Sequence, residues 1–213
     1  MSAAGRRTTR PAVESRVMSS SSDAPPGFHA EPEAVARVIL GRRTIHQFRP
    51  EVPPLDDVMA ALDAARWAPN HHHTEPWRFR LAGPKTIEKI IALNTQVVTR
   101  KKGPEAARQK LLRWSTIPGW VIATCRVSED PQRQEEDYAA CCCAVHNMSL
   151  VLWSRGIGLK WSTGGVTRDP AFAETAGFHP EEERVVGLLW YGYPEKIPAQ
   201  QRKPLADVLT VLP

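Results

Sequence analysis

Residues 133–163, RQEEDYAACCCAVHNMSLVLWSRGIGLKWST, decide the fold class. Apolar and small side chains recur in this stretch at helical spacing, which predicts one long helix over 133–155. Gly156 provides a stop, and residues 159–163 resume with the apolar and aromatic side chains of a strand. A long amphipathic helix that passes at once into a strand indicates a helix packed on a sheet.

The sequence on both sides of this stretch alternates between helix and strand patterns. Runs rich in β-branched and aromatic residues predict further strands at 77–81, 120–127 and 183–193. Helical spacing predicts helices at 34–41 and 54–68, one or two more between 85 and 114 with a break at Gly103-Pro104, and a short one from Asp169-Pro170. This order of elements predicts an α+β sheet covered by helices.

Size and charge limit the class of protein. The chain has 213 residues, of which 42% are hydrophobic, and a chain of this size can form a core without disulfide or metal support. No window approaches the ~20 consecutive apolar residues of a membrane span, so we expect no membrane partner. The net charge is +5, but no zinc-finger spacing or aromatic-studded basic strand accompanies it. We therefore expect no nucleic-acid partner.

The first 30 residues differ in composition from the rest. They are rich in Ser, Ala, Pro and Arg, and they contain too few apolar residues to offset the entropy cost of ordering. The sequence therefore predicts a disordered tail over 1–30 and a single domain over 31–213. A transit peptide and a true start at Met18 are alternatives that the composition leaves open.

The cysteines indicate the redox environment. Cys141, Cys142 and Cys143 are consecutive, and neighbouring helical side chains point about 100° apart, so they form no local disulfide. No CxxC pair offers zinc spacing. We expect buried, reduced thiols, which suggest a cytoplasmic location.

A first polar motif lies in residues 41–48, GRRTIHQF. Arg42, Arg43 and Thr44 place two guanidinium groups and a hydroxyl at the end of a helix. Arginine binds phosphate oxygens bidentately, so the motif fits a phosphate or a polyol chain. An exposed basic helix terminus is the alternative.

A second polar motif lies in residues 68–77, APNHHHTEPW. Three histidines suggest a metal, but consecutive side chains diverge in a regular backbone and no HExxH pattern is present, so we expect no metal. Amide and imidazole groups between two prolines fit better as hydrogen-bond donors to a planar polar ligand. Trp77 is expected to anchor the following strand in the core.

Two later segments are weak signals by themselves. Residues 156–165, GIGLKWSTGG, join a short strand to a glycine-rich turn with exposed hydroxyl and N–H groups. Residues 201–205 carry Arg202 and Lys203, which either meet an anion or form a solvated surface.

In this order and spacing, the four segments resemble the FMN-dependent nitroreductase family. The resemblance continues through residues 185–194, VVGLLWYGYP, and covers about Glu31 to Leu209. It is nearest to the short, minimal NAD(P)H nitroreductases that carry an Asn-His or Asp-His pair in the loop. The resemblance implies a nitroreductase-like fold, with a central, mostly antiparallel sheet flanked by helices, in an intertwined homodimer with FMN at the interface.

The resemblance also implies which residues bind FMN. Matching positions are Arg42, Arg43 and Thr44 in the first motif; Pro69, Asn70, His71 and His73 in the loop that reaches the flavin of the partner subunit; Trp161, Ser162 and Thr163 beside the ring; and Arg202, or Lys203, at the phosphate.

The chain departs from the family pattern at His46, where many relatives have Lys or Arg. Reduction places negative charge on the N1–C2=O edge of a flavin, so a cation there favours the reduced form. Histidine titrates near neutrality, which leaves the charge at this position open. A second departure is Glu75, where Gln is usual.

The function implied by the resemblance is that of a ping-pong reductase. NADH or NADPH delivers hydride to the flavin and leaves, and a nitroaromatic, quinone or similar acceptor then takes two electrons. No protein acid, base or nucleophile is expected, because solvent can supply the proton. Dehalogenation, flavin fragmentation or enoate reduction on the same fold, and flavin storage with little turnover, are open alternatives.

Overall fold

The computed structural model describes residues 31–212, so the tail expected over 1–30 lies outside it. The helices are α1 (Pro32–Gly41), α2 (Leu55–Ala65), α3 (Pro84–Lys102), α4 (Pro104–Trp114), α5 (Pro131–Ser154) and α6 (Ala171–Ala176). The strands are β1 (Trp77–Leu81), β2 (Gly119–Arg126), β3 (Gly158–Ser162) and β4 (Glu183–Gly192). No helix in this part of the chain is long and apolar enough to cross a membrane.

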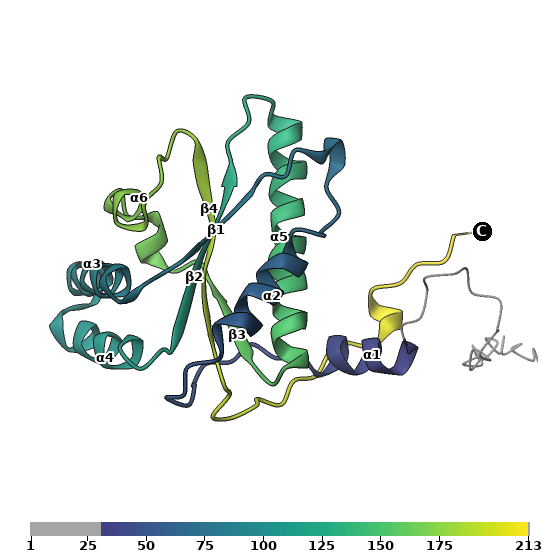
Figure 1. The fold of residues 1–213 in the computed structure, drawn as a ribbon, viewed down its shortest axis with the longest axis horizontal. Coiled ribbons are helices and arrows are strands. Elements are labelled where there is room, and N and C mark those ends of the chain that lie inside the picture. The colour runs from purple at the N-terminus through teal and green to yellow at the C-terminus, as the bar shows by residue number, and fades with distance from the viewer. Residues whose placement is uncertain (1–30, 213) are drawn as a thin grey trace, which may run out of the picture.

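The four strands form one antiparallel sheet in the order β1-β2-β4-β3. A shift in the β2–β4 register between Ala123 and Thr124 marks a bulge in the central pair. Helices α2 and α5 cover one face of the sheet, and α3, α4 and α6 cover the other (Figure 1). The predicted α+β class, with an antiparallel sheet flanked by helices, is therefore confirmed.

Each face of the sheet has its own apolar core. On the α5 face, Met148 and Leu152 are completely buried. On the other face, the rings of Trp114, Trp120 and Trp190 pack with centroids 4.9 to 5.5 Å apart. Because both faces are covered, the central strands β2 and β4 are buried over most of their length.

Helix α5 begins and ends where its sequence provides caps. The Asp130 carboxylate accepts a hydrogen bond from the Gln132 N–H at 2.9 Å, and Gly156 follows the helix with a φ of 74°. The three consecutive cysteines turn around this helix, so that Cys141 is buried, Cys142 is half-buried and Cys143 is exposed. The expectation of buried thiols is therefore wrong for Cys143.

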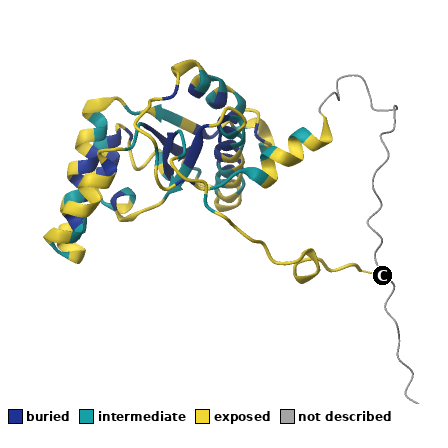
Figure 2. Cartoon of the chain, turned by 90° about the horizontal axis from the view of Figure 1, so that it is seen from below, coloured by how far each residue is buried: buried dark blue, intermediate teal, exposed yellow. Residues whose placement is uncertain are grey.

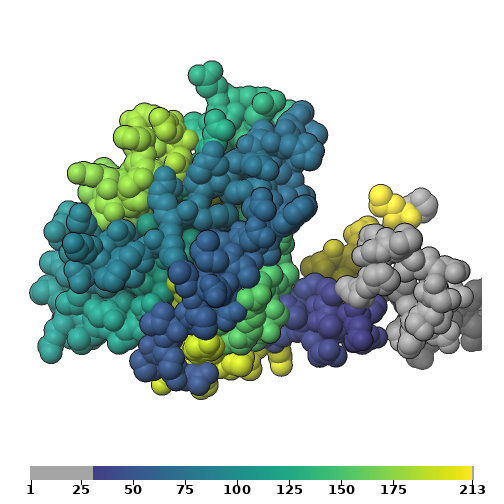
Figure 3. Space-filling view, viewed as in Figure 1, coloured from purple at the N-terminus to yellow at the C-terminus, as the bar shows by residue number. Residues whose placement is uncertain are grey.

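Two segments expose apolar side chains and project from the body of the molecule (Figures 2 and 3). Helix α1 has no buried residue, and its Leu40 is 73% exposed. The C-terminal segment exposes a similar set: Leu205, Val208, Leu209, Val211 and Leu212. The apolar face expected on α2 is also divided, since Val58 is buried whereas Met59 is exposed. These surfaces have no partner within the described chain.

Gly158 lies where β3 meets the segment that follows α1. A Cβ at this position would lie 2.3 Å from Cγ1 of the buried Ile45. Gly158→Ala is therefore expected to lower the free energy of unfolding by about 1–3 kcal/mol, as overpacking does elsewhere. Urea unfolding measures this change. Gly83→Ala is the control, because its Cβ meets nothing within 4 Å, and equal midpoints for the two variants would contradict the expectation.

Candidate functional site

The first polar motif lies against β3. Thr44 forms a parallel bridge with Leu159, and the Ile45 N–H donates to the Leu159 carbonyl at 3.2 Å. This pairing places the exposed Thr44 beside the strand that leads into Ser162 and Thr163. Two segments that the sequence singled out separately therefore meet in one place.

Two guanidinium groups from opposite ends of the described chain converge at this place. The pKa of Arg42 is lowered by burial and by the positive charges of Arg202 and Arg43. None of the ion pairs between described residues includes Arg42 or Arg202. Two neighbouring cations without a carboxylate partner form a donor set that suits a phosphate.

Arg43, unlike Arg42, donates hydrogen bonds to backbone carbonyls. Its Nη1 donates to the Leu40 carbonyl at 2.6 Å and to the Arg42 carbonyl at 2.9 Å. These carbonyls belong to the end of α1, where the helix leaves acceptors free. Arg43 thus stabilises the end of α1. This contact is the one expected if the motif is a basic helix terminus.

Trp161 is fixed within the protein. Its Nε1–H donates to the Val186 carbonyl at 2.8 Å, and its ring lies where a side chain at Gly187 would otherwise stand, since a Cβ there would be 2.2 Å from Nε1. Ser162 is half-buried and Thr163 is exposed. Thr163, just after the end of β3, is therefore accessible to a ligand, whereas the Trp161 indole is held by the sheet.

The histidine loop is held by Asn70. Its Oδ1 accepts from the Glu75 N–H at 2.7 Å, and its Nδ2 donates to the Thr74 hydroxyl at 3.1 Å. His72, His73 and Glu75 all have positive φ, between 44° and 60°. Non-glycine residues adopt this conformation at a cost, so the loop has a definite shape that the Asn70 side chain maintains.

A buried carboxylate joins this loop to α5. The Thr74 hydroxyl forms a short hydrogen bond with Asp137, which is 4% exposed. A cavity of about 330 Å³ lies beside the loop, lined by Arg66, Trp67, Ala68, Pro69, Asn70, His73, Glu75 and Trp77. Trp77 is 9% exposed, as expected of a core anchor, whereas Trp67 is 77% exposed. Pro69, Asn70 and His73 therefore border a hollow, as residues that meet a ligand would.

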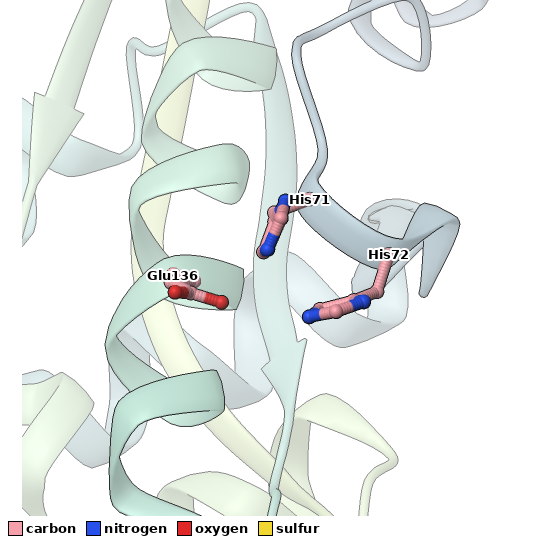
Figure 4. Close-up of side chains that lie close together, drawn as sticks. All are labelled: His71, His72 and Glu136. Carbon is pink, nitrogen blue, oxygen red and sulfur yellow. The ribbon is translucent and has the colours of Figure 1, made fainter.

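The loop brings two histidines and a glutamate together (Figure 4). Ligand atoms of His71, His72 and Glu136 lie within 4.8 Å of one another, and the two rings are 3.9 Å apart between centroids. Consecutive side chains diverge in a regular backbone, but the backbone is irregular here, because His72 has the left-handed conformation with a φ of 60°. No hydrogen bond from a described residue orients either ring, as metal-binding imidazoles usually require. The absence of a bound metal stays a prediction, which elemental analysis of purified protein can check.

A second basic cluster was not predicted from the sequence. Partial burial of the His46 ring, followed by the charges of Lys160 of β3 and Arg113 of α4, lowers the pKa of His46. Burial and the charges of Arg113 and Lys110 lower the pKa of Lys160 to about 8. The adjoining cavity of about 420 Å³ is lined by His46, Gln47, Phe48, Arg113, Thr116, Ile117 and Glu195. We call His46, Lys110, Arg113 and Lys160 the α4 cluster.

An α+β domain with two basic centres, one at Arg42 and Arg202 and the other at the α4 cluster, is a candidate for binding an elongated anionic ligand. The family model that describes the nitroreductase family matches residues 39–193, and the chain belongs to this family.

Named relatives support the same assignment. The chain is 28% identical over 178 residues to the provisionally named NAD(P)H nitroreductase YfhC of Bacillus subtilis, covering 81% of this chain and 91% of that protein. The structure of a nitroreductase-like family protein from Bacillus cereus is 30% identical, with a TM-score of 0.73, covering 84% of this chain and 95% of the other. A Bacteroides fragilis nitroreductase with bound FMN is 25% identical, with a TM-score of 0.64 and coverage of 84% and 98%.

Proposed function

We propose that this protein binds FMN and transfers hydride from NADH or NADPH to an oxidised small molecule, such as a nitroaromatic or a quinone, in a ping-pong cycle. The observation that carries the proposal is the pair of basic centres around β3. One contains Arg42 and Arg202, and the other is the α4 cluster. Family membership and the FMN bound to the Bacteroides relative support the same cofactor.

The donor set fits the two ends of FMN. Arg42 and Arg202 would hold the phosphate, and the Thr44 hydroxyl would meet the ribityl chain or the pyrimidine edge. Ser162 and Thr163 would lie beside the ring, where Trp161 gives the strand a rigid support. The bound flavin supplies the hydride chemistry, and the protein provides position and electrostatic field.

The histidine loop serves the second subunit of a homodimer in this proposal. The loop contacts α5 at Asp137, whereas the Arg42 motif lies beside β3, beyond the other end of α5 (Figure 1). At 1.5 Å per residue, Asp137 and the end of α5 are about 25 Å apart. Pro69, Asn70, His71 and His73 are thus far from the Arg42 motif of their own chain, and they would reach the cofactor of the partner. The exposed apolar faces of α1 and the C-terminal segment would form the interface.

The chain's own residues orient the reactants and exclude water. No side chain is assigned as acid, base or nucleophile, since solvent can supply the proton that accompanies reduction of the acceptor. The remaining partners in this proposal are small molecules, and the location is the cytosol. All four cysteines are free thiols, as a reducing compartment would keep them.

Two measurements test this function. Purified protein should be yellow, with flavin absorbance that is released on denaturation. Steady-state oxidation of NADH or NADPH should then accelerate when a nitrofuran or a quinone is added. Protein that retains FMN without any acceptor-dependent rate would be a storage protein, and colourless protein that does not bind added FMN would exclude both functions.

A further inference from the structure

The α4 cluster gathers basic side chains from three separate parts of the chain. His46 follows α1, Lys110 and Arg113 lie on α4, and Lys160 lies on β3. None of the ion pairs found among residues 31–212 includes any of them. The carboxylate on the cavity wall is that of Glu195, and it too is outside those ion pairs. The cluster is thus suited to binding an anion.

Lys160 is the most firmly positioned member of the cluster. It is half-buried in the strand that leads into residues 161–163, and it pairs in register with Trp190 of β4. Its Nζ lies 4.7 Å from the centroid of the Trp190 ring, which is itself 2% exposed. His46, Lys110 and Arg113 are all exposed.

His46 is a poor source of charge at neutral pH. Burial and the charges of Lys160 and Arg113 lower its pKa from an ordinary value of 6.5, so its neutral form predominates at pH 7. A neutral imidazole still donates a hydrogen bond, but it does not offset a full negative charge. The full positive charges that act on His46 are those of Lys160 and Arg113.

We propose that Lys160, held over Trp190 and beside Arg113, supplies the positive charge that stabilises the reduced flavin. This inference rests on the proposed function, and it names a residue outside the set that the resemblance assigns to FMN. A cation near the N1–C2=O edge favours the reduced form of the cofactor over the oxidised form. Lys160 therefore contributes to the reduction potential rather than to the holding of the phosphate.

Titration of Lys160 adds a pH-dependent contribution to the reduction potential of bound FMN. With a pKa of about 8, Lys160 is protonated at pH 7 and loses its proton as the pH rises through that value. A negative charge nearby raises this pKa again, so Lys160 takes up a proton from solvent when the bound cofactor becomes negative. Above about pH 8, one additional proton therefore accompanies reduction, and the preference for reduced over oxidised FMN falls about tenfold per pH unit, or about 30 mV for a two-electron couple.

The test is spectroelectrochemical titration of the FMN-loaded protein between about pH 6.5 and 9.5. Lys160→Met should lower the preference for reduced FMN about tenfold at neutral pH, or about 30 mV, and should remove the additional slope above pH 8. Lys160→Arg should retain the neutral-pH potential without the additional slope, because arginine does not titrate in this range. Lys85→Met, an exposed charge removal on α3, is the matched control and should leave the potential unchanged.

Two results would overturn the inference. If Lys160→Met and Lys85→Met both have the wild-type potential at every pH, then Lys160 does not supply the charge, although FMN binding and the proposed function stand. If the wild-type protein does not bind FMN at all, then the proposed function fails, and the inference fails with it. Fluorescence titration with oxidised FMN is the control that each variant still binds the cofactor.

Discussion

Replacing Arg42 by alanine is expected to weaken FMN binding about tenfold to a hundredfold, because a hydrogen bond to a charged group contributes about 1.5–3 kcal/mol. Arg42 lies near Arg202, and the two guanidinium groups lack a carboxylate partner among the described ion pairs. A phosphate would accept charge-assisted hydrogen bonds from both of them, so removing either one removes part of the binding free energy. Fluorescence titration of apoprotein with FMN measures the dissociation constant.

The same titration includes a second arginine variant, the double variant and a control. Arg202→Ala should have an effect similar to that of Arg42→Ala, and the double variant should lose less than the sum, since both side chains act on one group. Lys89→Ala removes an exposed charge from α3 and should leave the affinity unchanged. Full FMN occupancy of Arg42→Ala after dialysis would refute this phosphate site.

Glutamate in place of Leu40 or Leu209 is expected to separate the subunits and release the flavin together. Both side chains are largely exposed in the single chain, at 73% and 54%, and both lie on the apolar segments that we assign to the interface. A charge in a buried apolar interface lacks compensation, so the dimer is destabilised. Analytical ultracentrifugation detected at the flavin absorbance measures the mass of the species that carries FMN.

Leu81→Glu is the control, because Leu81 is also exposed, at 42%, but lies on β1. It should sediment as the wild-type protein does. A monomer that remains yellow would contradict the proposal that the histidine loop acts on the cofactor of the other subunit. A wild-type dimer that neither Leu40→Glu nor Leu209→Glu affects would place the interface elsewhere.

Local pattern was sufficient to predict the sheet and most helices. The strands are apolar runs between clear breaks, and α5 has strong helical spacing, so each element shows its own period. The direction in which α1 and α2 expose apolar side chains was not predictable in this way. Periodicity identifies an apolar face, but it does not say whether the partner of that face is the chain's own sheet or another molecule. Leu40 and Met59 are therefore visible as unpartnered only in the structure.

The candidate site was predictable where its residues are neighbours in sequence. Arg42 and Thr44 form such a motif, and so does the histidine loop. Lys160 and Arg113 were missed because their proximity depends on how α4 packs on Trp190 of β4, and a single sequence does not contain that packing. Arg43 of the same motif binds the end of α1 in the structure, which the sequence alone left open as an alternative. The assignment of the motif residues to FMN stays a prediction.

The convergence of Arg42 with Arg202 connects the two ends of the described polypeptide. A ligand bound by both arginines ties the C-terminal segment non-covalently to the segment after α1, so its loss frees the C-terminal segment. Digestion by a carboxypeptidase should therefore be slow in yellow protein and fast in colourless protein. Cofactor supply would in this way influence how long each molecule survives in the cell.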